Sequence, residues 1–188
     1  MNAQSIFTLL STQTPVITCD LPRTQRGIYG LIDHAGQLRY IGSTSAENEN
    51  FRKRIHQRHR TGSEHVSHKF SAIYNCGRMW RDRNSQRHDA DAKISKDLRS
   101  AFIAKYCRAV YVPFVGTKGE IEVLEYAVIA LAPRENILWN GSKGLVYDEP
   151  VDLVDALIDE LELATEDREA LDRQCVRANS HRAGLHQS

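Results

Sequence analysis

Residues 27–42, GIYGLIDHAGQLRYIG, contain two runs of β-forming residues on either side of a short polar segment. The runs are IYGLI and LRYIG, and Asp33 and Gly36 between them supply the chemistry of a tight turn. This pattern predicts a β-hairpin that carries Tyr29 on its first strand and Tyr40 on its second. A hairpin needs further partners to cover its apolar face, so the elements that follow it decide the fold class.

Those elements alternate between helical and extended patterns. Residues 50–60 place apolar or aromatic side chains at fourfold spacing and predict a helix, and 65–75 predicts a second one. AVYVPFV at 109–115 is rich in β-branched and aromatic residues and predicts a strand. A helix over 120–132 then ends at a proline. The order predicts an α/β (α+β) fold, a small antiparallel three-stranded sheet flanked by helices.

The same sequence patterns predict the domain organisation. We expect residues 1–26 to form an N-terminal extension and 27–147 to form the main domain, with a basic insertion at 78–108. Residues 148–188 are expected to form a helical appendage, with two amphipathic helices within 151–175 and a disordered end.

The net charge of +1 conceals an asymmetry between the two parts of the chain. Residues 1–147 hold 21 Lys and Arg against 13 Asp and Glu, whereas 148–188 hold 4 against 11. This division indicates a basic body that meets a polyanion and an acidic tail that does not. A solvated acidic helix that favours solubility would produce the same imbalance, so charge alone does not decide between them.

Composition predicts a protein of the cytoplasm. Hydrophobic residues make up 41% and charged residues 26%, and no apolar run approaches the roughly 18 residues that cross a membrane. The first residues lack the basic and long apolar regions of a signal peptide. Cys19, Cys76, Cys107 and Cys175 lie far apart and form no CxxC pair, which favours reduced thiols over a zinc site.

The two ends of the hairpin carry tripeptides that resemble a known family. Gly27-Ile28-Tyr29 and Tyr40-Ile41-Gly42 are similar to the paired motifs of the GIY-YIG nuclease superfamily. That family places an arginine on the helix after the second strand. Arg54 in FRKRIHQRH matches this position best, and Arg52 is the alternative.

Two later motif positions also have counterparts. The family places a glutamate in a later helix after a leucine, and Leu124-Glu125 fits that pattern. An asparagine follows the proline that ends this helix. Asn140, within LWNG, is favoured because the Trp-Asn pair resembles restriction-type members, and Asn136 is the alternative.

The resemblance implies how these residues divide the chemistry of phosphodiester hydrolysis. Glu125 would hold one Mg²⁺ or Mn²⁺ ion, bound firmly only when the DNA phosphate completes its coordination. Arg54 would grip the phosphate with its guanidinium fork. Tyr29 would activate water, which requires a stabilised phenolate, and Tyr40 would position Tyr29 or bind the phosphate.

The histidines depart from the family pattern. Many members carry a histidine four residues after the arginine, where this chain has Arg58, while His59 stands five residues after Arg54. His56 belongs to the alternative register of the arginine. His65 matches another histidine of homing-type members, and both His59 and His65 are candidates for facing the phosphate.

DNA contacts are expected outside the core motif. The insertion has nine Lys and Arg against four Asp, which suits contacts with phosphates and guanine edges. The candidates in or near it are Arg78, Arg81, Arg83, Arg87, Arg99 and Arg108, with Arg52, Arg58 and Lys69 from the preceding helices.

The sequence therefore predicts a metal-dependent endonuclease that cuts double-stranded DNA, sequence-specific and most like type II restriction enzymes. A homodimer through the acidic helices would let one site per chain cut both strands. Two alternatives remain open: a structure-specific nuclease for branched DNA, and a catalytically idle nucleic-acid-binding module on the same fold.

Overall fold

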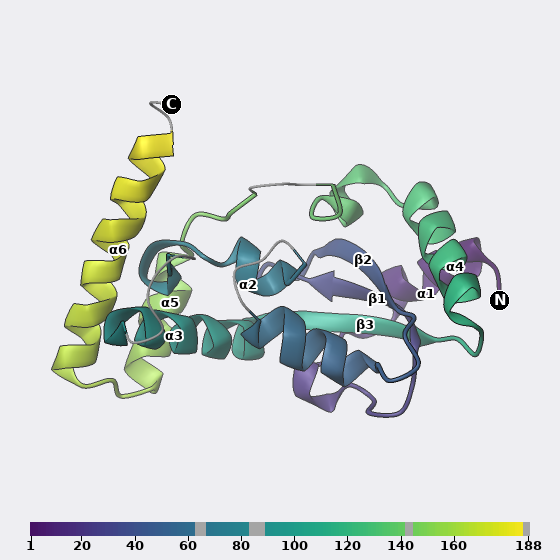
Figure 1. Ribbon diagram of the computed structural model, residues 1–188, viewed down its shortest axis with the longest axis horizontal. Coiled ribbons are helices and arrows are strands. Elements are labelled where there is room, and N and C mark those ends of the chain that lie inside the picture. The colour runs from purple at the N-terminus through teal and green to yellow at the C-terminus, as the bar shows by residue number, and fades with distance from the viewer. Residues whose placement is uncertain (63–66, 83–88, 142–144, 186–188) are drawn as a thin grey trace. The chain divides into compact units, whose positions relative to one another are not determined.

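The computed structural model describes residues 1–62, 67–82, 89–141 and 145–185 (Figure 1). The protein is a mixed α+β structure that divides into two compact units. Unit 1 consists of Met1–Arg60 and Ile103–Lys143, and unit 2 of Thr61–Phe102 and Gly144–Ser188. No helix within the described ranges is both long and apolar enough to cross a membrane.

Unit 1 contains the predicted three-stranded antiparallel sheet. Its strands are β1 (Gly27–Ile32), β2 (Leu38–Thr44) and β3 (Arg108–Pro113), in the order β2-β1-β3. The turn of the β1-β2 hairpin uses Gly36 at a φ of 77°, and Asp33 accepts hydrogen bonds from the backbone amides of the turn. The hairpin predicted over 27–42 is confirmed.

Alternate residues of β1 face opposite sides of the sheet. Ile28 and Ile32 lie in the core formed with α1 (Ala3–Thr12) and α4 (Lys118–Leu131). The intervening Tyr29 packs against the helix η2 (Arg52–His59) on the other face. All six residues of β1 are buried, which is the state of a central strand covered on both faces.

The N-terminal segment is part of unit 1. α1 begins after Asn2, whose side chain accepts a hydrogen bond from the amide of Ser5, and it buries Ile6 and Leu10 against the sheet. Val16 forms an isolated bridge with Ala109 of β3. We expected residues 1–26 to form an N-terminal extension. Because α1 buries Ile6 and Leu10 against the sheet, this segment is instead a structural part of unit 1.

The first helix after the hairpin is wound as a π-helix over most of its length. Its hydrogen bonds run from residue i+5 to residue i, as from the amide of Arg60 to the carbonyl of Ile55. The next helix, α2 (Lys69–Ile73), is shorter than the predicted 65–75, and residues 63–66 lie outside the described part of the chain.

Unit 2 combines the middle of the chain with its C-terminal end. α3 (Ala90–Tyr106) continues into unit 1, and α5 (Val151–Glu160) and α6 (Thr165–Leu185) are the two predicted acidic helices (Figure 1). We expected the last dozen residues to be disordered, but the helix extends to residue 185.

Ion pairs join the basic and acidic segments within unit 2. Arg78 pairs with Glu149 and Asp155, each at 2.6 Å, and Arg173 pairs with Asp91 at 2.8 Å. The segments that we expected as a separate insertion and appendage therefore neutralise part of each other's charge. The charge asymmetry between residues 1–147 and 148–188 is therefore smaller on the surface of folded unit 2.

Candidate active site

A polar cavity of about 340 Å³ lies along the edge of β2 in unit 1. Because β2 is an edge strand, side chains from η2 and from α4 both reach this edge. Tyr40 of β2, Arg54 of η2 and Glu125 of α4 meet there. The full lining is Tyr40, Ser43, Thr44, Ser45, Ala46, Glu49, Arg54, Arg58, Lys118, Glu122 and Glu125.

The two motif tyrosines occupy different depths. Tyr40 is half-buried and lines the cavity, whereas Tyr29 has no exposed surface and lies behind it, with a ring-centroid distance of 6.0 Å. The Tyr29 hydroxyl is 2.7 Å from Nε2 of His59, which is also fully buried. The three rings form a cluster with centroid distances of 5.7 to 6.0 Å.

The glycines of both tripeptides are required by close packing. Gly42 pairs with Tyr29 across the hairpin, and a Cβ on it would lie 2.8 Å from the Tyr29 hydroxyl and 2.6 Å from the Tyr40 ring. Gly27 has a φ of 146°, and a Cβ there would collide with the carbonyl oxygen of Val112. Each motif glycine therefore leaves room for a neighbouring strand or for the tyrosine pair.

Burial governs the acidity of the tyrosines. Desolvation raises the pKa of Tyr29 well above its ordinary value of 10.0, and the neighbouring Tyr40 raises it further, while Arg54 opposes the shift. Desolvation also raises the pKa of Tyr40, with Glu125 adding to the effect. Both side chains are neutral at pH 7, and hydrogen bonding between them lowers the cost of a negative charge on Tyr40.

Arg54 and Arg58 both line the cavity, and Arg54 is the one in contact with the tyrosine pair. Its Nε atom is buried and has no hydrogen-bond acceptor within the described residues. Burial lowers the pKa of Arg54, but Tyr29 and Tyr40 more than offset this and the pKa rises. The alternative, Arg52, is not among the cavity residues, and its amide bonds to the carbonyl of Pro22.

The π-helical winding explains the spacing of the histidine. In an α-helix the residue one turn along is i+4, whereas in a π-helix the hydrogen-bonded turn is closed by i+5. His59 therefore lies one turn beyond Arg54 despite the extra residue between them. His56 instead lies 2.9 Å from the Thr18 hydroxyl through Nδ1, away from the cavity lining.

Glu125 is one of three carboxylates that line the cavity, with Glu49 and Glu122. It accepts a short hydrogen bond from the Ser43 hydroxyl. Desolvation raises the pKa of Glu125, Ser43 and Arg54 act in the opposite direction, and the nearby Glu122 raises it. Glu125 is half-buried, and a bound cation would stabilise the charge of a partly desolvated carboxylate of this kind.

The donor set suits a metal that keeps most of its coordination for water and substrate. Within the described ranges, no cluster of three or more His, Cys, Asp or Glu side chains could hold an ion. Glu125, with Glu122 one helical turn before it, offers one or two carboxylates. Mg²⁺ commonly binds to one or two carboxylates together with phosphate oxygens and waters, so these residues fit it.

Asn140 stabilises the edge strand and does not line the cavity. Its side-chain oxygen accepts from the Ile41 amide at 3.0 Å, and its nitrogen donates to the Ile41 carbonyl at 2.6 Å. Asn136 makes one longer bond, 3.5 Å, to the Leu38 carbonyl. These bonds satisfy the outer backbone groups of β2 and fix the strand that carries Tyr40.

Ser43, Ser45 and Glu122 line the cavity but were not among the predicted site residues. Ser45 donates to Glu122 at 3.0 Å, parallel to the Ser43–Glu125 bond. Both carboxylates lie on one face of α4 because they are three residues apart. That spacing, together with two serines directly after the second tripeptide, was visible in the sequence.

Most of the basic residues proposed for DNA contact have partners within the protein. Arg58 pairs with Glu49 at 2.8 Å, and Lys69 is 8% exposed. Arg99 is 1% exposed and donates to the Met79 carbonyl, while Arg108 donates to backbone carbonyls of its own turn. Three predicted residues lie outside the described part of the chain: His65, Arg83 and Arg87.

Comparison with known proteins adds no relative: no family model, no curated protein and no solved structure matches the chain.

Proposed function

We propose that this protein is a metal-dependent DNA endonuclease with a GIY-YIG active site. The observation that carries the proposal is the meeting of Tyr29, Tyr40, Arg54, His59 and Glu125 in one place. These side chains come from four elements and span almost a hundred residues of sequence. They supply a charge for phosphate, a carboxylate for a cation and a chain of groups that exchange protons.

Arg54 is the phosphate-binding group in this proposal. A guanidinium presents a planar fork of donors that suits a pair of phosphate oxygens. The buried Arg54 Nε lacks an acceptor among the described residues, and a buried donor without an acceptor costs roughly 1–3 kcal/mol.

Glu125 is the cation ligand, and Ser43 orients it through their hydrogen bond. A divalent cation bound there would stabilise charge on the phosphoryl oxygens and on the leaving 3′-oxygen. The elevated pKa of Glu125 makes metal binding compete with a proton, so cleavage should weaken as the pH falls toward that pKa.

The proton path runs from Tyr40 to Tyr29 and then to His59. Tyr40 is the tyrosine on the cavity wall, so it receives the proton of the attacking water. As Tyr40 passes its own proton to the Tyr29 oxygen, the Tyr29 hydroxyl proton moves to Nε2 of His59, 2.7 Å away. This order differs from the one that the family resemblance implies, in which Tyr29 contacts the water, because Tyr29 is completely buried.

The proposal is tested with supercoiled plasmid DNA, the full-length protein and Mg²⁺ or Mn²⁺. We expect cleavage that EDTA stops, with discrete fragments if recognition is sequence-specific as in restriction enzymes. Glu125→Gln should remove cutting and retain DNA binding, and Glu135→Gln, an exposed carboxylate of unit 1, is the matched control. Full activity of Glu125→Gln would refute the site.

Two other outcomes of this experiment would favour one of the two alternative functions. Preferential cutting of flaps or junctions over linear duplex would assign a structure-specific nuclease. DNA binding without cleavage in either metal would assign an idle binding module. Light scattering of the free and DNA-bound protein tests the expected homodimer.

A further inference from the structure

Glu49 lies between β2 and η2 and lines the polar cavity of unit 1. Its amide bonds to the Ala46 carbonyl at 3.0 Å, and the side chain of the next residue, Asn50, accepts from the Lys53 amide at 2.8 Å. The backbone around Glu49 is therefore held both by the turn after β2 and by the start of η2. The Glu49 side chain is only 9% exposed, so its carboxylate is recessed from bulk solvent.

One oxygen of this carboxylate has a partner and the other does not. Oε1 of Glu49 pairs with Arg58 at 2.8 Å. Oε2 is buried, and within the described ranges it is the one buried carboxylate oxygen without a hydrogen-bond donor. The other two carboxylates of the cavity, Glu122 and Glu125, accept from serine hydroxyls. Folded proteins satisfy nearly all buried acceptors through protein groups or ordered water, so Oε2 indicates a ligand that donates to it.

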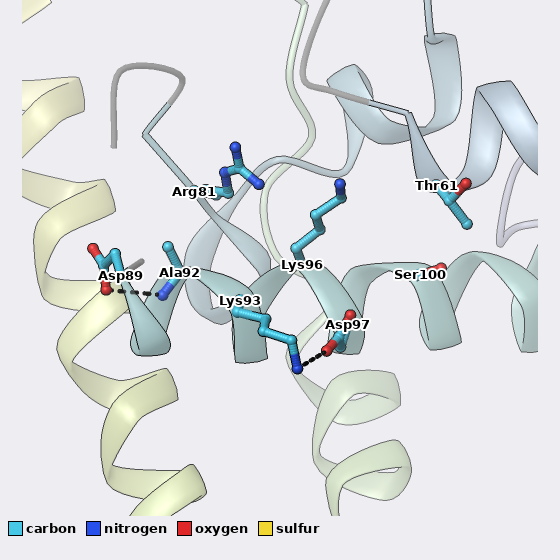
Figure 2. Close-up of a pocket in the computed structure, with 8 residues that line it drawn as sticks. All are labelled: Thr61, Arg81, Asp89, Ala92, Lys93, Lys96, Asp97 and Ser100. Atoms are coloured by element: carbon cyan, nitrogen blue, oxygen red, sulfur yellow. Dashed lines mark hydrogen bonds and ion pairs between the residues drawn. The ribbon is translucent and has the colours of Figure 1, made fainter. Parts of the chain in front are cut away.

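A polar cavity of unit 2, of about 320 Å³ along α3, provides a comparison (Figure 2). Figure 2 shows both of its carboxylates joined to partners from the same lining. Asp97 pairs with Lys93 at 3.5 Å, and Asp89 accepts from the Ala92 amide at 3.2 Å. Lining a polar cavity therefore does not by itself leave a carboxylate without a donor.

The surroundings of Oε2 determine which donor fits. Arg58 is paired with the same carboxylate, and Arg54 lies close enough that Glu49 opposes the lowering of its pKa by burial. These two positive charges disfavour a metal cation at Oε2, and a phosphodiester has no proton to donate. Because the side chain is almost fully buried, the donor is also small. A water molecule meets these conditions, and the cavity of about 340 Å³ has room for it.

We propose that Oε2 of Glu49 holds the water that attacks the scissile phosphate. Tyr40, which receives a proton from this water in the proposed reaction, lines the same cavity, as does the phosphate-binding Arg54. A water has two hydrogens, so it can donate to Glu49 and to Tyr40 at once. The catalytic role rests on the proposed nuclease function, whereas the binding of a water to Oε2 does not.

The chemical step uses each hydrogen of the water differently. The water oxygen forms the new bond to phosphorus, one proton passes to Tyr40, and the other stays in the hydrogen bond to Glu49. The bond between phosphorus and the 3′-oxygen breaks, and the 3′-oxygen leaves with the electron pair and takes up a proton from solvent. Glu49 thereby fixes the direction in which the oxygen lone pair points.

The first experiment is a crystal structure of the full-length protein without DNA, at a resolution that shows ordered waters. We expect a water within about 3.2 Å of Oε2 of Glu49. A metal ion at this position, a protein donor, or no ordered water would overturn the proposal. This result does not depend on whether the protein cleaves DNA.

The second experiment measures cleavage of a labelled duplex under single-turnover conditions with Mg²⁺, and duplex affinity in EDTA. Glu49→Gln should lower the cleavage rate constant about 10²-fold, because an amide is a weaker acceptor and can turn its NH₂ group toward the water. The affinity should stay within about twofold of the wild type, since the lost interaction is with the water and not with DNA. Glu47→Gln, an exposed carboxylate of the same turn outside the cavity lining, is the matched control.

Two further variants separate the water from the ion pair and from folding. Arg58→Gln breaks the same ion pair but keeps Oε2, so its rate constant should fall about fivefold at most. Equal losses in Arg58→Gln and Glu49→Gln would overturn the proposal. Formate, a small carboxylate, should restore the rate of Glu49→Ala about tenfold with saturation and leave Glu47→Ala unchanged. No response to formate, together with weakened duplex binding, would mean that Glu49 has a structural role only.

The two experiments also distinguish this inference from the proposed function. If the wild type cuts DNA and Glu49→Gln cuts equally fast, the nuclease function stands and the role of Glu49 is overturned. If the wild type cuts nothing while a water occupies Oε2, the nuclease function and the catalytic role fail together, and the water site alone stands.

Discussion

The hydroxyl of Tyr29 lies 2.7 Å from Nε2 of His59, and neither side chain has exposed surface. When a buried histidine accepts the proton of a neighbouring tyrosine, the imidazolium that forms pairs with the phenolate. This contact connects the centre of the sheet to the helix η2 and stands directly behind Tyr40.

The first prediction concerns this pair. Tyr29→Phe and His59→Gln should each lower the cleavage rate by roughly 10²–10⁴-fold, since both interrupt one proton path. The double variant should be little worse than either single one because the two groups act as a unit. Rate constants measured under single-turnover conditions give the coupling, and additive losses would contradict a shared path.

A second prediction addresses the π-helix. Deleting Gln57, an exposed residue between Arg54 and His59, should let the helix close as an α-helix with the histidine at i+4. The variant should keep measurable cleavage, because Arg54 and His59 remain one turn apart. An alanine inserted at the same place should abolish it. Equal loss of cleavage in both variants would show that the π-helical winding does not align Arg54 with His59.

Gly42 provides the third prediction. Gly42→Ala should reduce cleavage about 10²-fold, because the new methyl group would displace the Tyr29 hydroxyl and the Tyr40 ring. Gly119→Ala is the matched control, since a Cβ there meets nothing within 4 Å. Duplex binding should be retained in both variants, and wild-type cleavage by Gly42→Ala would mean that the tyrosine pair tolerates movement.

The fourth prediction follows from the raised pKa of Glu125. Ionisation of this half-buried carboxyl is harder in the folded state, so the free energy of unfolding falls as the pH rises from 4.5 through the folded pKa. Glu125→Gln removes this penalty and should raise the Tm at pH 7, with no gain below pH 4. The same comparison with Glu135→Gln controls for loss of a surface charge. A lower Tm for Glu125→Gln at pH 7 would contradict the burial argument.

His56 gives a prediction of opposite sign. Burial lowers the pKa of His56 to about 4, with Arg60 and Arg52 adding to the effect. The unfolded chain then binds the proton more readily, so stability is lost as the pH falls from 6.5 toward 4. Thermal melts of His56→Gln should show a shallower decline over this window. If the Tm of His56→Gln fell with pH as steeply as that of the wild type, groups other than His56 would cause the loss of stability in acid.

Sequence patterns among residues that are close in the chain predicted the sheet correctly. The hairpin, the third strand and α4 follow from alternation, turn residues and the proline that ends the helix, and all of these depend on near neighbours in the chain. The role of α1 was not predictable in this way. Its apolar run is too short to show whether it packs on a sheet or extends from it.

The sequence by itself determined which residue types are available for the proposed phosphodiester chemistry, because the two tripeptides, Arg54 and Glu125 are spaced by local elements of known geometry. Tertiary structure alone decided which tyrosine faces the cavity, that Asn140 closes a strand edge, and that Arg78 neutralises Glu149. Burial and ion pairing depend on partners that are distant along the chain, so they arise only when packing brings those partners together.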